Sequence, residues 1–175
     1  MQSRRVNTGM KIREILHEVT YPPFVQRYLH GHCDALAVAL AVALEKPIVA
    51  FYPMHQHQDG SVRRDPDFVH VAIRDGTQVM DAKGLRSVSA MMADFSSLLA
   101  LVKRPEDIQV TAVSRIFPDA REFIAETNCN PAEPMMAFRD LLRYPPLARL
   151  IPSDKDLRRL IQAELKELAD EHGGW

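Results

Sequence analysis

The most apolar stretch of the chain is the ten-residue run from Ala35 to Leu44, in which no side chain carries a polar atom. A membrane-spanning helix needs about 20 apolar residues, so this run is too short to cross a bilayer. We therefore predict a helix that is buried on most of its faces. Its N-terminal end is formed by Gly31, His32 and Cys33, where the first backbone N–H groups of a helix have no partner within it.

Apolar and polar positions on either side of this run predict further elements. Upstream, Thr8 is a candidate N-cap for an N-terminal helix, and a short helix is expected over Val25–Leu29. Downstream, Ile48–Tyr52 has the β-branched and aromatic content of an interior strand. The polar, turn-rich segment Pro53–Asp67 is expected to be an exposed loop.

The segment that follows predicts a β-hairpin. Asp75–Gly76 is a strong signal for a two-residue turn, because a type I′ turn needs positive φ at both central positions. With these residues as the turn, Arg74 faces Thr77, and the same register puts His70 opposite Asp81. Facing residues project from the same side of the sheet, with Cα atoms about 5.5 Å apart in a hydrogen-bonded pair. The register therefore predicts a hydrogen-bonded His–Asp dyad.

The second half of the chain is predicted to be mostly helical. A single helix is expected from about Ser89 to Lys103, followed by a strand over Ile108–Ser114 and by two helices between about 118 and 144. Ser153 and Asp156 resemble a capping box at the start of a last helix. Its apolar stripe is formed by Leu157, Leu160, Ile161, Leu165 and Leu168.

These elements predict an α+β fold, in which the helix that carries Cys33 packs on a small antiparallel sheet and the C-terminal region is helical. We expect residues 1–175 to form a single domain. Within it, residues 1–116 would form the core and residues 117–175 a helical C-terminal extension.

Composition and charge favour a soluble globular protein. Hydrophobic residues make up 46% of the chain and charged residues 26%, with a formal net charge of −1. This charge gives no reason to expect a nucleic-acid or membrane partner. The chain has only two cysteines and starts without a cationic and then apolar leader, so a cytoplasmic protein with reduced thiols is expected. Cys129 has no histidine near it in the sequence and is interpreted as structural.

Cys33 and the predicted dyad suggest nucleophilic catalysis. The dipole of a helix favours a thiolate at its N-terminus, and a neighbouring imidazolium favours it further. If the hairpin lies across this helix end, Cys33 is the nucleophile, His70 the base and Asp81 the group that orients the imidazole. Cys33 would then attack a carbonyl carbon, and His70 would protonate the leaving amine.

At these residues the chain resembles the papain-like and transglutaminase-like cysteine hydrolase superfamily. The core of that superfamily is a helix that begins with the nucleophilic cysteine, followed by antiparallel strands that carry histidine and then aspartate or asparagine. The segments "GHCDA" (Gly31–Ala35), "HVAI" (His70–Ile73) and "MDAKG" (Met80–Gly84) occupy these places in order. The resemblance implies a peptidase, deamidase or acyltransferase that acts on an amide or thioester of a peptide or protein, without a cofactor.

The resemblance also suggests residues for the oxyanion hole. Papain-like proteases place a glutamine shortly before the cysteine, and Gln26 lies seven residues upstream of Cys33. His32 is a second candidate for contact with the substrate or the oxyanion. The backbone N–H of Cys33 is a further donor for the oxyanion.

Two other functions stay open at this point. The same fold without catalytic activity would serve as a protein-interaction module that uses its C-terminal helices, and a buried, inert Cys33 fits that function. A metal-binding protein would draw its imidazole and thiolate ligands from His30, His32, Cys33, His55, His57 and His70. Their spacing matches no usual metal motif, so no metal site is predicted. We expect His55 and His57 to lie in a solvated loop or at the rim of a cleft.

Overall fold

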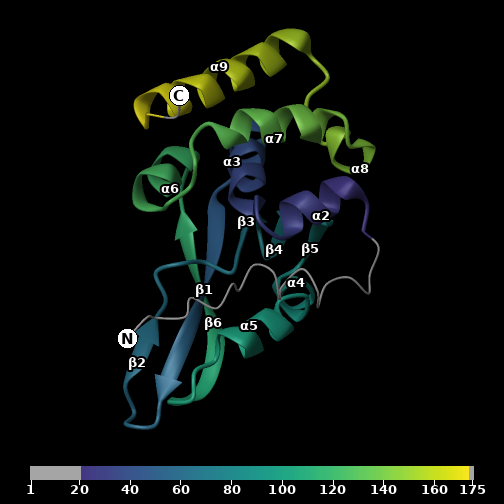
Figure 1. The fold of residues 1–175 in the computed structure, drawn as a ribbon. Helices are drawn as coiled ribbons and strands as arrows, with labels where there is room; N and C mark the ends of the chain where they lie inside the picture. The colour runs from purple at the N-terminus through teal and green to yellow at the C-terminus, as the bar shows by residue number, and fades with distance from the viewer. Residues whose placement is uncertain (1–20, 174–175) are drawn as a thin grey trace.

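The computed structural model describes residues 21–173, so the helix expected after Thr8 lies outside the described residues. The fold is α+β, with an antiparallel sheet of six strands and helices in the N-terminal, middle and C-terminal parts of the chain (Figure 1). No helix in this described part of the chain is long and apolar enough to cross a membrane.

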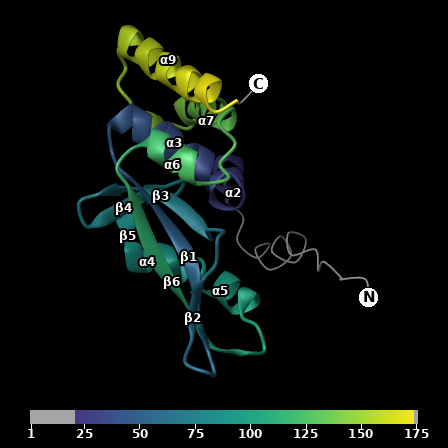
Figure 2. The same ribbon diagram turned by 90° about the vertical axis from the view of Figure 1, so that its left-hand side faces the viewer.

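The apolar run forms the central helix, α3 (Cys33–Leu44), as predicted. All but the first and last turns of α3 are buried on every face, because small alanine side chains let neighbours pack closely from both sides. The sheet covers one side, with β3 in closest contact, and the C-terminal helices cover the other (Figures 1 and 2). A shorter helix, α2 (Pro23–Leu29), leads into α3.

Strand β1 (Ile48–His57) is the centre of the sheet. On one side, β6 (Asp107–Phe117) pairs with it along its whole length. On the other side, β3 (His70–Asp75) pairs with its first half and β2 (Val62–Arg64) with its second half. Two short strands, β4 (Gln78–Asp81) and β5 (Gly84–Ser87), extend the sheet beyond β3.

The β3–β4 hairpin forms, but the predicted register was wrong by two residues. Asp75 pairs with Gln78, so the two-residue loop begins at Gly76 instead of Asp75. Gly76 takes a positive φ of 61°, which glycine adopts without the steric cost that other residues pay. Continuing this register places Ala72, instead of His70, opposite Asp81. A shift of two residues keeps every side chain on its predicted face, because side chains alternate with a period of two.

The segment predicted as an exposed loop is largely sheet. Strand β1 continues to His57, and its last part is sandwiched between β2 and β6. His55, expected in a solvated loop, is fully buried. The prediction failed because the pairing strand β6 lies about 50 residues further along the chain, where local polarity gives no hint of it.

The single helix predicted over Ser89–Lys103 is two helices, α4 (Val88–Ala93) and α5 (Ser96–Val102). The break falls at Phe95, whose backbone leaves the helical region and whose side chain is only 1% exposed. Burying this ring requires a change of direction that a continuous helix would not give. The hydroxyl of Ser96 donates to the carbonyl of Ala93 across the break.

Four helices follow β6, and they pack onto the central helix. They are α6 (Ala120–Glu126), α7 (Glu133–Leu142), α8 (Pro145–Ala148) and α9 (Lys155–Glu171). Helices α7 and α9 contact α3 on the side away from the sheet (Figure 1). The C-terminal region therefore completes the burial of α3.

The last helix differs in detail from the prediction. Its N-cap is Asp154, whose carboxylate accepts from the backbone N–H of Leu157, instead of Ser153. The buried part of its stripe is formed by Ile161, Leu165, Leu168 and Ala169, whereas Leu157 and Leu160 are exposed.

Candidate functional site

The structure brings His70 and Asp81 together. His70 Nε2 lies 2.9 Å from Asp81 Oδ2, and both side chains are almost completely buried. The imidazole of His70 also stacks on the ring of Phe95, with 4.3 Å between centroids and 25° between planes. The imidazole is therefore fixed both at its edge and on its face.

Asp81 is the anchor of a small ionic network. Its Oδ2 also accepts from Arg86 at 2.6 Å, and its Oδ1 accepts from the backbone N–H of Lys83 at 2.9 Å. Arg86 and Lys83 both donate hydrogen bonds to the carboxylate of Asp94. Burial alone would raise the pKa of Asp81, but the hydrogen bonds and charges of His70 and Arg86 outweigh burial and lower it. The carboxylate is therefore ionised, and it orients His70.

The second ring nitrogen of His70 is not hydrogen-bonded to any described residue. Its Nδ1 is buried and has no hydrogen-bond partner among residues 21–173. Because the ionised Asp81 accepts a hydrogen bond from the Nε2–H group, the Nδ1 of a neutral ring carries a lone pair. Such a nitrogen can take a proton from a neighbouring group.

Cys33, at the start of α3, lies close to β3 at Val71, the residue that follows His70. The amide of Arg74 donates to Pro47 on the β1 side, so by alternation the amide of Val71 points to the other side, beyond the end of β4. This N–H lies close enough to the sulfur of Cys33 to lower the pKa of its thiol. The start of α3 therefore touches the strand one residue away from His70.

The expectation of a thiolate at Cys33 is not met in this structure. The side chain is buried, and burial raises the pKa of its thiol to about 12, with a smaller contribution from the neighbouring carboxylate of Asp34. The N–H of Val71 acts in the opposite direction but is weaker. No ion pair or hydrogen bond joins Cys33 to His70 among the contacts of the described residues. The helix N-terminus was expected to dominate, but loss of water outweighs it.

The two residues suggested for the oxyanion hole are held elsewhere. The side-chain amide of Gln26 is exposed on α2 and donates to the carbonyl of Tyr21 at 2.7 Å. His32 Nδ1 lies 2.8 Å from Glu133 Oε2, which ties the start of α3 to α7. Both side chains are engaged with other partners, so the backbone N–H of Cys33 is the remaining oxyanion candidate from the sequence.

Sequence reasoning missed His30 as a neighbour of the dyad. Its ring lies 6.0 Å from that of Phe95, and its buried Nε2 has no hydrogen-bond partner within residues 21–173. Burial lowers the pKa of His30, and the nearby His70 lowers it further. Its position three residues before Cys33 was a signal that it lies near the site, but the sequence analysis considered it only as a candidate metal ligand.

A second histidine cluster lies at the far end of β1. His55 Nδ1 is 2.7 Å from Asp107 Oδ2, and His55 Nε2 is 3.0 Å from Asp65 Oδ2. Two carboxylates can accept from one ring only if both nitrogens carry protons, so His55 is an imidazolium. Burial opposes this charge, but both carboxylates outweigh burial and raise the pKa of His55. His57 Nδ1 lies 3.0 Å from the other oxygen of Asp107.

The remaining candidates carry less chemistry. Within the part of the chain that the structure describes, no group of three His, Cys, Asp or Glu side chains is placed to hold a metal ion. Cys129 is buried, and burial raises the pKa of its thiol, in agreement with a structural role.

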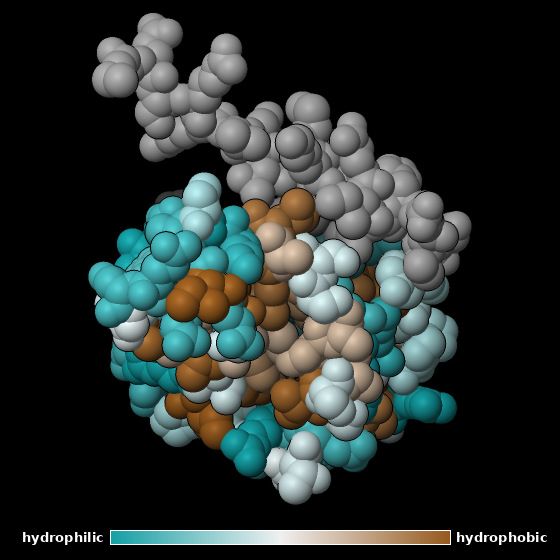
Figure 3. Space-filling model, turned by 90° about the horizontal axis from the view of Figure 1, so that it is seen from below, coloured by the Kyte–Doolittle hydropathy of each residue, from teal (hydrophilic) through white to brown (hydrophobic). Residues whose placement is uncertain are grey.

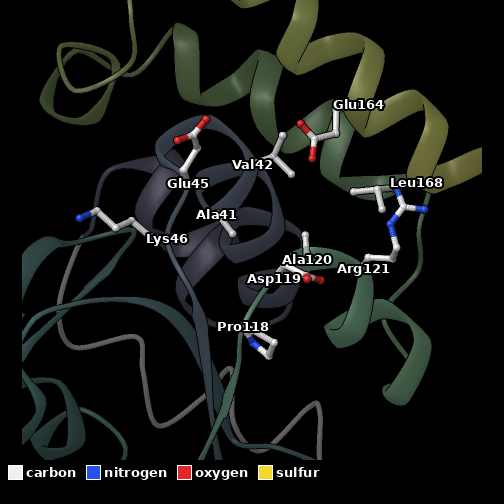
Figure 4. Close-up of a pocket in the computed structure, with 10 residues that line it drawn as sticks. All are labelled: Ala41, Val42, Glu45, Lys46, Pro118, Asp119, Ala120, Arg121, Glu164 and Leu168. Carbon is white, nitrogen blue, oxygen red and sulfur yellow. The ribbon is translucent and has the colours of Figure 1, made fainter.

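A pocket of about 360 Å³ lies at the opposite end of α3 from Cys33, between α3, α6 and α9 (Figure 4). Several of its charged groups are already paired: Lys46 binds Asp75, and Arg121 binds Glu171. Neither His70 nor Asp81 is among the residues that line this pocket.

Comparison with known proteins gives no relative for this chain. No protein-family model matches it, and no curated protein or solved structure is similar enough to count as a match.

Proposed function

We propose that the chain is a thiol-dependent hydrolase or acyltransferase that acts on an amide through Cys33, His70 and Asp81. The observation that carries the proposal is the state of His70. Its Nε2 is fixed by Asp81, and its buried Nδ1 has no partner, next to the strand position that touches Cys33. A base held by a carboxylate beside a nucleophile is the arrangement that thiol hydrolases need.

The raised pKa of Cys33 determines how this chemistry would start. The resting thiol is neutral, so no preformed thiolate–imidazolium pair attacks the substrate. His70 Nδ1 instead removes the thiol proton as the sulfur forms its bond to the carbonyl carbon. The same proton then passes to the leaving amine as the C–N bond breaks. Water or an acceptor amine finally releases the acyl group from Cys33.

The substrate class follows from the resemblance to papain-like and transglutaminase-like hydrolases. It is an amide of a peptide or protein, cleaved in the main chain or at a glutamine side chain. No cofactor takes part, because the nucleophile, base and orienting carboxylate are all supplied by the chain. In this proposal His30 is a neighbour of the base, with no assigned step.

The test is an amide-turnover assay with two readouts. The chain is incubated with a peptide library and a glutamine-rich protein, and new amino termini and released ammonia are measured separately. New termini identify a peptidase, and ammonia identifies a deamidase or an acyltransferase. We expect Cys33→Ser and His70→Gln each to lower turnover by about 10³-fold or more, as for other residues that act as a unit. The control Cys129→Ser, at the other buried thiol, keeps full turnover.

A specific observation supports a second candidate function, a catalytically inactive module of the same fold that binds other proteins. It is the burial of Cys33, whose thiol pKa of about 12 is that of an inert core residue. If neither readout exceeds the Cys33→Ser background for any substrate, and no acyl group is found on Cys33 by mass spectrometry, the enzymatic proposal is wrong. The inactive module is then the better function.

A further inference from the structure

Strand β6 is a long edge of the sheet. It pairs with β1 over its whole length and with no other strand among residues 21–173. In Figure 2 the strand β6 runs in front of β1, and no described helix lies over the middle of β6. The backbone groups on its outer side therefore need to be accounted for.

The hydrogen bonds of β1 show which way its residues point. The carbonyl of Phe51 accepts from Val69, and the carbonyl of Pro53 accepts from Asp65, both on the β2 and β3 side. The backbone N–H and C=O groups of the odd-numbered residues of β1 therefore point toward β2 and β3. Those of even-numbered residues such as Tyr52 point toward β6.

The same alternation fixes the direction of the β6 residues. Tyr52 pairs with Val113, so the backbone N–H and C=O groups of odd-numbered residues in the middle of β6 point toward β1. The N–H and C=O groups that point away from the sheet belong to Val110, Ala112, Ser114 and Ile116. Within the described residues no hydrogen bond to these outward groups is formed.

This edge has few of the features that keep edge strands apart. Edges are usually protected by charged side chains, proline or bulges. Between Ile108 and Ile116 the only charged side chain is Arg115, and it is held by Glu126. Ile108 and Ile116 are 56% and 44% exposed. When the molecule is viewed from the end where β2 and α5 lie, hydrophobic residues are exposed among the hydrophilic ones (Figure 3).

We propose that two copies of this chain pair antiparallel through β6, about a twofold axis at Val113. The axis is chosen by the outward groups, which are spaced evenly on both sides of Val113. In this register Ile116 faces Val110 of the other copy, and Ala112 faces Ser114. Each of these facing pairs exchanges both of its backbone hydrogen bonds.

The side chains agree with a second copy as the occupant. Ile116 packs against Val110, which covers an exposed apolar residue with another apolar residue. Arg115 meets Thr111, so no like charges face each other across the axis. A twofold interface needs only this one strand, because the same surface serves both copies. The result is one continuous sheet across two chains.

The first experiment is disulfide trapping at the axis. In the proposed register Val113 faces itself in a non-hydrogen-bonded pair, with Cα atoms about 4.5 Å apart. That separation allows a disulfide, so Val113→Cys is expected to give a covalent dimer under mild oxidation. In the control Thr111→Cys the two new thiols are about 13 Å apart along the strands and stay reduced. Equal trapping of both variants would overturn the register.

The second experiment tests the same register by charge. Ala112→Lys with Ser114→Lys places like charges opposite each other across the axis. We expect it to raise the dimer dissociation constant about tenfold in sedimentation equilibrium. Ala112→Lys with Ser114→Glu makes the facing pair opposite in charge and restores the dimer. Circular dichroism checks that both variants are folded. A wild-type chain that is monomeric at its highest soluble concentration, or a dimer unaffected by the double lysine, overturns the proposal.

Discussion

His70 and Asp81 share a hydrogen bond of 2.9 Å although the β3–β4 register does not place them opposite each other. The register instead leads to Ala72 opposite Asp81, with His70 one diagonal position away on the same face. Diagonal neighbours lie roughly 7–8 Å apart, which an imidazole and a carboxylate together can span. Asp81 Oδ2 also accepts from Arg86, so one carboxylate oxygen holds both the imidazole and the guanidinium.

The sharing of Asp81 predicts a large loss of stability when its charge is removed. Asp81→Asn leaves Arg86 without its buried counter-ion and weakens the bond to His70. We expect the free energy of unfolding to fall by about 3 kcal/mol, the cost of breaking a buried pair. The matched control is Asp94→Asn, which removes the other carboxylate on Arg86 at a site that is 23% exposed. It should cost less than about 1 kcal/mol. Urea unfolding followed by circular dichroism measures both, and equal losses would contradict the assignment of Asp81 as the anchor.

The His70–Asp81 dyad was predictable because the prediction required only that both side chains lie on the same face of the sheet. A glycine-containing turn between two alternating segments limits the register to a few choices, and a shift of two residues leaves His70 and Asp81 on one face. The central helix was predictable for a similar reason, since a continuous apolar run has few structural alternatives to a buried helix.

What the sequence could not show depended on distant partners. His55 looked solvated because its neighbours in the chain are polar, whereas its real neighbours are Asp107 on β6 and Asp65 after β2. The resting thiolate expected at Cys33 is opposed by burial, which depends on everything packed around the start of α3. Side-chain burial is a tertiary property, and periodicity within one element reports only the direction of a side chain.

The imidazolium at His55 predicts a stability that declines as the pH rises above about 6.5. Its pKa is raised in the folded chain, so its stabilisation is fully present below about pH 6.5, the value in an unfolded chain, and is lost as the pH rises through the folded value. The pKa of Asp107 is lowered, so the contribution of that carboxylate is lost only as the pH falls below the ordinary range of aspartate. The titratable and charged groups that face this site are Asp65, Asp107, His57, Arg63 and Arg104.

His55→Asn isolates this effect. We expect the gap in unfolding free energy between the wild type and His55→Asn to be widest near pH 6 and to shrink steadily above it. The control is His57→Asn, which changes an imidazole that is less deeply buried and lies beside one carboxylate oxygen of Asp107. Its gap should be smaller at every pH. A gap for His55→Asn that is constant or grows toward alkaline pH would show that the ring is neutral in the folded chain.

Helix α9 offers a matched pair for testing how firmly the C-terminal region is attached. Leu165 is 1% exposed, whereas Leu160 on the same helix is 65% exposed. Leu165→Ala should lower the free energy of unfolding by about 3 kcal/mol, because it leaves a cavity in the packed interior. Leu160→Ala should change it by less than about 0.5 kcal/mol. A single cooperative unfolding transition is expected in both variants. A separate early transition for Leu165→Ala would show that the C-terminal helices unfold independently of α3.

The buried thiol of Cys33 predicts unusually slow alkylation. With a pKa of about 12, its thiolate fraction at neutral pH is about 10³-fold lower than that of a free cysteine. Iodoacetamide labelling, followed by mass spectrometry, should therefore rise with pH without a plateau until the chain unfolds, and it should become fast in urea. Because the resting thiol is not ion-paired, His70→Ala should leave this pH profile unchanged while amide turnover is lost. A wild-type profile that titrates well below pH 8.5 and moves upward in His70→Ala would instead establish a preformed thiolate–imidazolium pair. The proton transfer from Cys33 to His70 would then precede substrate binding.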